Sequence, residues 1–263
     1  MLPAAHHEEI DGFRWRSDEI TRIEGFSDAV FGFAVTLLIV SLEVPRTSTE
    51  LLHTMRGFGA FVVTFLMLAS MWYAQHIFFR RYGLKDRVTV VLNLVLLFTV
   101  LFFVYPLKFL FTNLLAAMMV KASGDPHHAA TEAVILPEHR AWIFLIFGAG
   151  FTAVFALFTL LYRHAYKKRE ILGLNEFEIY ETQYTMKRMM IAGGVGLSYF
   201  AIAAMETMPH RTRGEKGLVI AVSIAISAVL GVLITIMLRA RAHRKRVARV
   251  WESTRKMPDP PRS

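Results

Sequence analysis

The sequence predicts an all-α integral membrane protein that crosses the membrane six times. Three observations predict this class: a high apolar content, apolar blocks long enough to span a bilayer, and basic residues concentrated in alternate links. Apolar residues make up 54% of the 263 residues, whereas a soluble domain averages about 45–50%. A soluble helical bundle would also need polar outer faces, which these blocks lack. The composition therefore favours lipid as the surroundings of most of the chain.

The apolar residues lie in six blocks of roughly 20–27 residues each. At about 1.5 Å per residue, a helix of this length crosses a hydrocarbon core of about 30 Å. The blocks are residues 22–44, 57–79, 88–114, 140–164, 186–208 and 217–239. They predict a six-helix transmembrane domain over residues 22–240, with a cytoplasmic N-terminus at 1–21 and a basic cytoplasmic tail at 241–263.

The basic residues predict how the chain is oriented. Of the 30 Lys and Arg, 21 lie in the N-terminus, the second-to-third link, the fourth-to-fifth link and the C-terminal tail, and 7 lie in the other links. Cytoplasmic segments carry such an excess. Both termini are therefore expected in the cytoplasm, which agrees with an even number of spans. The expected location is the cell (inner or plasma) membrane, as a multi-pass protein.

The net charge of +9 has a membrane explanation as well. The strongest basic run, RARAHRKRVAR at residues 239–249, directly follows the last block. Such a run determines topology and lies against anionic lipid head groups. Membrane lipids are therefore an expected partner, and nucleic acid is not.

Candidate catalytic and metal sites are weak. The chain has no Cys, and the adjacent histidines at 6–7 and 127–128 lack the spacing that sets a coordination geometry. Ser27, Asp28 and His76 supply the residue types of a hydrolytic triad, but no oxyanion hole or strained nucleophile turn accompanies them. We expect no metal site, no cofactor and no enzyme activity.

Polar residues within the first three blocks are the strongest functional candidates, because such groups are costly in a membrane. They lie toward the cytoplasmic third of the bilayer. Trp72, Gln75 and His76 share one face of the second block, since they are spaced i, i+3 and i+4. The sequence predicts a buried network formed by Ser27, Asp28, Gln75, His76 and Asn93.

The first block divides into faces when it is placed on a helical wheel at about 100° per residue. Phe33 and Val40 share a stripe with Arg22, Phe26 and Ala29, and Thr36 and Leu37 lie at its edges. Asp28 lies about 120° from Arg22, so the two cannot pair within one helix. By itself, this apolar stripe fits a pore lining and an ordinary helix-packing face equally well.

These residues also carry a resemblance to a known family. RIEGFSD fits the pattern R-x-x-x-F-S-D through Arg22, Phe26, Ser27 and Asp28, and AVFGFAVTLLIVSLEVP follows it. The segment resembles the first transmembrane helix of TMEM175 potassium channels, in their prokaryotic single-repeat, six-helix form. Further similarity runs through WYAQHIFF, LNLVLLF with Pro106, and LYRHA.

The resemblance implies a potassium-selective channel that passes K⁺ passively through a homotetrameric pore lined by the first helix. Carried over by position, Phe33 and Val40 would form apolar constrictions, with Thr36 as the family's threonine and the permeant K⁺ near it. Leu37, at the edge of the same stripe on the wheel, is also expected to line the pore. It also implies that the motif residues couple helices instead of touching the ion. These motif residues are Arg22, Phe26, Ser27 and Asp28, and we expect the polar residues of the second and third blocks to act with them. The expected coupling set is therefore Arg22, Phe26, Ser27, Asp28, Trp72, Gln75, His76 and Asn93.

Two departures from the family pattern bear on these expectations. Phe33 stands where the family commonly has Leu or Ile, and Gln75 replaces the first histidine of a W-x-x-H-H pattern. A secondary transporter and a non-conducting membrane scaffold remain alternatives, although no repeat between the two halves of the chain favours a transporter.

Overall fold

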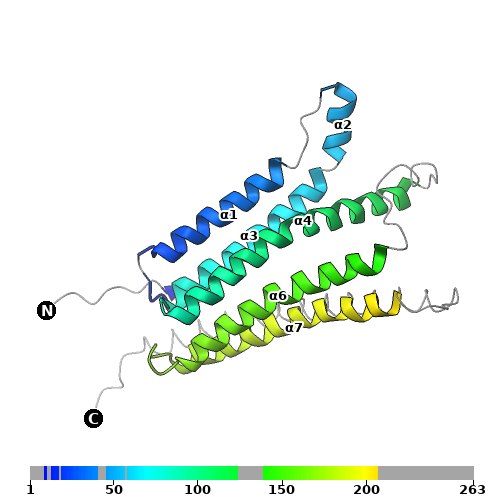
Figure 1. Ribbon diagram of the computed structural model, residues 1–263. Coiled ribbons are helices and arrows are strands. Elements are labelled where there is room, and N and C mark those ends of the chain that lie inside the picture. The colour runs from blue at the N-terminus through cyan, green and yellow to red at the C-terminus, as the bar shows by residue number, and fades with distance from the viewer. Residues whose placement is uncertain are drawn as a thin grey trace, which may run out of the picture. The chain divides into compact units, whose positions relative to one another are not determined.

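Long helices make up most of the described chain in this computed structural model (Figure 1). The structure describes residues 9–10, 13–17, 19–40, 46–56, 58–123 and 139–206. The helices are α1 (Arg22–Val40), α2 (Ser48–Arg56), α3 (Phe58–Tyr82), α4 (Arg87–Ser123), α6 (Arg140–Lys167) and α7 (Glu176–Glu206). The chain divides into two compact units, and all six helices belong to the unit Ser17–His210.

Four of the described helices are long and apolar enough to cross a membrane. They are α1, α3, the Arg87–Asn113 part of α4 and the Ala141–Lys167 part of α6, and they coincide with the first four predicted blocks. Residues 186–206 of the fifth block lie in α7, which is not among the four. The sixth block lies outside the described residues. The count of six spans and the cytoplasmic location of both termini therefore stay predictions.

The other unit, Met1–Arg16 with Arg211–Ser263, is described only over a short N-terminal part. Strand β1 (Glu9–Ile10) pairs antiparallel with β2 (Phe13–Arg14). The guanidinium of Arg16 lies 5.6 Å from the centre of the Phe13 ring. This hairpin is a small departure from the all-α class among the described residues.

The starts of α1 and α7 are fixed by reciprocal side-chain caps. At α1, the Glu24 carboxylate accepts hydrogen bonds from the Thr21 backbone N–H (2.8 Å) and hydroxyl (2.7 Å). At α7, the Glu178 carboxylate accepts from the Asn175 N–H at 3.0 Å, and the Glu178 N–H donates to the Asn175 side chain at 2.8 Å. Such capping boxes satisfy backbone donors that a helix start leaves unpaired. Glu24 is therefore buried as a cap and is not a candidate ion ligand.

Aromatic residues tie the end of α3 to α6 and α7. The buried rings of Phe78 and Tyr82 meet the Tyr162 ring edge-on, with centroids 5.4 and 5.9 Å apart. The Tyr82 hydroxyl also lies 2.7 Å from the Thr182 hydroxyl, in hydrogen-bond distance. Edge-to-face packing and a satisfied phenol stabilise such a buried cluster. This end of the bundle is thus held by contacts among three helices.

Glycines allow α6 and α7 to approach each other closely. A Cβ at Gly148 would lie 2.8 Å from the Gly196 carbonyl oxygen, and a Cβ at Gly196 would lie 2.7 Å from the Thr152 backbone nitrogen. Real Cβ atoms do not tolerate such distances to backbone atoms. Small residues at helix interfaces are common in membrane proteins because they allow close backbone packing.

We expect Gly196→Leu to loosen the α6–α7 pair and to destabilise the protein by at least about 1–3 kcal/mol, the usual cost of overpacking. The measurement is the melting temperature of the detergent-solubilised protein, together with its size-exclusion profile. Gly194→Leu is the matched control, because nothing lies within 4 Å of a Cβ at Gly194. Equal stability of the two variants would contradict this packing arrangement.

Candidate functional site on the first helix

Helix α1 is buried on one face and exposed on the opposite face. It packs against α3 and α4 (Figure 1). The residues that it buries against the rest of this chain are Glu24, Ser27, Phe31, Ala34 and Leu38. Their spacing places them on one side of the helix. One face of α1 therefore packs within the chain, and the opposite face contacts something outside it.

The residues expected from the sequence to line a pore lie on or beside this uncovered face. Phe33 is 58% exposed and Val40 is 71% exposed. Thr36 is exposed as well, and Leu37 is half-buried at the edge of the stripe. Arg22 and Phe26 continue the exposed face toward the start of the helix. In a single chain, this face would be exposed whether it contacts lipid, another subunit or the water of a pore in the assembled protein.

The Thr36 hydroxyl has a defined orientation. It donates a hydrogen bond to the backbone carbonyl of Gly32 at 3.0 Å, within α1. A hydroxyl has one proton to donate and two lone pairs that accept. Because the proton is used within the helix, the lone pairs of the Thr36 oxygen remain available on the exposed side.

A buried chain of hydrogen bonds joins α1, α3 and α4. The Gln75 amide donates to the Asn93 side-chain carbonyl at 2.8 Å. The Asn93 amide donates to the Ser27 hydroxyl at 2.9 Å, and Ser27 donates to the Ile23 carbonyl at 2.7 Å. The Ser27 and Asn93 side chains are fully buried, and Gln75 is nearly so. In a low-dielectric interior, such a satisfied network holds its helices in one arrangement.

Asp28 and His76 both contact Trp72, apart from this chain of hydrogen bonds. The Trp72 indole N–H donates to the Asp28 carboxylate at 2.7 Å. The His76 ring stacks on Trp72 with centroids 5.7 Å apart. The structure therefore divides the expected five-residue network in two, because α1 turns Ser27 toward α4 and Asp28 toward the exposed edge of α3. Among the described residues, no partner is recorded for the Arg22 side chain.

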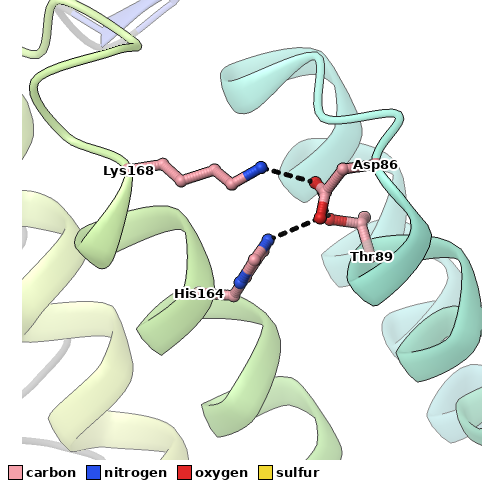
Figure 2. Close-up of polar contacts among 4 residues, drawn as sticks. All are labelled: Asp86, Thr89, His164 and Lys168. Carbon is pink, nitrogen blue, oxygen red and sulfur yellow. Dashed lines mark hydrogen bonds and ion pairs between the residues drawn. The ribbon is translucent and has the colours of Figure 1, made fainter.

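A second polar cluster joins the start of α4 to the end of α6 (Figure 2). The Asp86 carboxylate accepts from the Thr89 hydroxyl at 2.8 Å, lies 2.8 Å from the His164 ring nitrogen and lies 3.2 Å from the Lys168 ammonium. Burial of Asp86 raises its pKa, but the bonds from Thr89, Lys168 and His164 outweigh burial and hold the pKa at about 2, below the ordinary 3.8. This cluster was not predicted from the sequence. The i, i+4 spacing of His164 and Lys168 was the available signal.

The low pKa of Asp86 predicts a pH dependence of stability. Since the folded state binds the proton more weakly than the unfolded state, the stabilisation is present above pH 3.8 and is lost as the pH falls toward about 2. The melting temperature of Asp86→Asn should lie several degrees below that of the wild type at pH 5, and the difference should shrink toward pH 2. Glu170→Gln is the control, because the Glu170 carboxylate is 86% exposed. A difference that is constant down to pH 2 would contradict the assignment.

These observations define a class of protein. The described helices form a multi-pass membrane protein whose first helix has one buried, polar-anchored face and one uncovered apolar face. Within the described helices, no group of three or more His, Cys, Asp or Glu side chains could hold a metal ion.

Comparison with known proteins identifies the family. The model of the family described as "Endosomal/lysosomal potassium channel TMEM175" matches residues 22–103. A protein named potassium channel from Marivirga tractuosa is 34% identical over 221 residues, which cover 83% of this chain and 89% of that relative. Another named potassium channel, from Chamaesiphon minutus, is 28% identical over 193 residues, covering 70% of this chain and 84% of the relative.

A solved structure gives the same result. The crystal structure of a variant of the potassium channel MtTMEM175, in complex with a nanobody–maltose-binding-protein fusion, aligns with a TM-score of 0.70 at 32% identity. The alignment covers 86% of this chain and 98% of that one. The chain therefore belongs to the TMEM175 family, in its short bacterial form. The family is one of ion channels and not of enzymes, and the resemblance in the first helix is confirmed.

Proposed function

We propose that the protein is a potassium-selective cation channel of the cell membrane. Four copies form the pore, α1 of each copy lines it, and K⁺ moves passively down its electrochemical gradient. Phe33 and Val40 form apolar constrictions, with Thr36 and Leu37 beside them. The names of the relatives support potassium as the permeant ion.

The observation that carries this proposal is the uncovered apolar face of α1. Phe33 and Val40 are among the exposed large apolar side chains of the described chain, while the opposite face of the same helix is buried and hydrogen-bonded. A helix that only anchored the protein in lipid would not need a buried polar network to fix its rotation. A pore-lining helix does, because a rotation of α1 would turn Phe33 and Val40 away from the axis.

Small residues support assembly around α1. At Gly25 and Gly32, nothing lies within 4 Å of a Cβ, so both positions are open on the single chain. Open glycines on a membrane helix allow another helix to come close. We place the neighbouring subunits against this side of α1, next to the stripe that faces the axis.

The chemistry of the stripe fits gating by wetting. Rings of Phe33 and Val40 offer no oxygen to replace the hydration shell of K⁺, so ions pass only while water fills the constriction. The Thr36 oxygen is the available polar group between them, because its proton is donated to Gly32. In this proposal, Thr36 contacts the hydrated ion between the two apolar rings.

The coupling residues act at a distance from the ion. The Ser27–Asn93–Gln75 chain and the Asp28–Trp72 bond fix the cytoplasmic half of α1 against α3 and α4. Because position 75 is an amide and not an imidazole, this chain of bonds does not change its charge near neutral pH.

The test is a recording from purified protein in a planar bilayer under a K⁺ gradient. Discrete unitary currents that reverse near the K⁺ equilibrium potential are the expected result. Flux coupled to a second ion, without unitary events, would show that the protein is a secondary transporter and not a channel. If a correctly folded tetramer gave no current, the protein would be a non-conducting scaffold.

A further inference from the structure

We propose that α2 is an interfacial helix, which lies in the plane of the membrane with its apolar side chains among the lipids. The partner is the boundary between head groups and acyl chains, on the membrane face where α1 ends and α3 begins. This inference uses the membrane-spanning class of the protein and does not depend on ion conduction.

The large apolar side chains of α2 share one face of the helix and are exposed on the described chain. Leu51, Leu52 and Met55 are 47%, 67% and 51% exposed. They occupy an arc of about 100° on the helical wheel, and Thr49 and Glu50 lie outside this arc. A soluble surface helix would turn such an arc toward its own core. Here the described part of the protein provides no core for it.

The connections of α2 restrict where it can lie. It follows α1 after residues 41–47 and is joined to α3 through residue 57. Both neighbours are long and apolar enough to span the membrane. A helix of 9 residues between two spanning helices begins and ends on the same side of the membrane, close to its surface. In Figure 1, α2 is seen at the ends of α1 and α3 and at an angle to both.

The residues at the start of α3 support the placement of α2 at the depth of the lipid head groups. Phe58, Phe61 and Phe65 form a stacked series, with ring centroids 5.7 and 6.3 Å apart. Phe58 is 49% exposed, directly after α2. The exposed Arg46 precedes α2. Interfacial helices combine apolar side chains with flanking cations that meet the lipid head groups. Lipid therefore fits this surface better than water does.

A second copy of the chain is the competing occupant of the apolar arc. The long helices give an assembly broad apolar faces with which to pack. The three exposed side chains of α2 form a small set, and exposed Phe58 follows them closely in the chain. We therefore assign the arc to lipid.

Site-directed spin labelling can test the assignment, because the chain has no native Cys. Single variants Leu51→Cys and Met55→Cys report on the apolar arc, and Thr49→Cys, about 160° from Leu51 on the wheel, is the control. Each labelled protein is reconstituted in vesicles of phosphatidylcholine and phosphatidylglycerol. Relaxation by oxygen, which concentrates in lipid, is compared with relaxation by a water-soluble nickel chelate.

The expected result is a ratio of oxygen to chelate accessibility several-fold higher at positions 51 and 55 than at position 49. Equal ratios at the three positions would mean that α2 projects into water and would overturn the proposal. Labels at 51 and 55 that neither reagent reaches, with dipolar broadening between copies, would assign the arc to a second subunit and would also overturn it. All three outcomes are independent of whether the protein conducts ions.

Discussion

Phe33→Ala is expected to increase potassium current several-fold and to weaken discrimination against sodium. Phe33 is 58% exposed on the uncovered face of α1. In the proposed tetramer, four phenyl rings around the pore axis would leave little room for a hydrated ion and would supply no oxygen in exchange for its water. Alanine widens the ring and makes it easier to wet. Unitary current and the K⁺/Na⁺ reversal potential, recorded in planar bilayers, measure both effects.

Two further variants make this experiment decisive. Phe33→Asn should also increase current, because a polar side chain keeps the constriction wet. Phe98→Ala is the matched control, because Phe98 is 70% exposed but lies on α4 and not on the proposed pore helix. Its current should be close to that of the wild type. If Phe33→Ala and Phe98→Ala behave alike, the proposed pore assignment of Phe33, Thr36, Leu37 and Val40 fails as a whole.

Asn93→Leu is expected to cause the largest loss of stability of any single change in the polar network. Its amide connects Gln75 on α3 to Ser27 on α1. Removing it leaves the Gln75 donor buried without its acceptor and removes the bond that holds α1. Each buried polar group left unpaired costs about 1–3 kcal/mol. The melting temperature and the fraction of intact oligomer in detergent measure the loss.

A double variant separates the network from a simple effect of volume. In Gln75→Leu/Asn93→Leu, the orphaned Gln75 donor is gone, and Ser27 keeps its bond to the Ile23 carbonyl. Because replacing both partners is less costly than stranding one, the double variant should be more stable than Asn93→Leu alone. Thr99→Val is the control on α4, since the Thr99 hydroxyl bonds to the Val95 carbonyl of its own helix. Additive losses in the double variant would argue against a coupled network.

The sequence predicted helices reliably where a local feature, such as a long apolar run, determines them. Apolar length located the first four spanning helices, and the R-x-x-x-F-S-D motif indicated the family that the comparisons confirm. Helix α2 was missed, because 9 residues with mixed polarity give no long apolar run. The helical wheel also placed Phe33, Thr36 and Val40 on one side of α1, and this is the side that the chain leaves exposed.

By itself, then, the sequence determined which segments are apolar enough for lipid and which residues share a helix face, because both follow from composition and from the helical period. Only the tertiary structure decided which polar groups meet. Asn93 forms hydrogen bonds with Ser27 and Gln75, and Asp28 accepts one from Trp72. The tertiary structure also brought Asp86 to His164, 78 positions away. Partners at such separations depend on how far each helix is rotated and shifted against its neighbours, and packing across all of the helices sets that rotation.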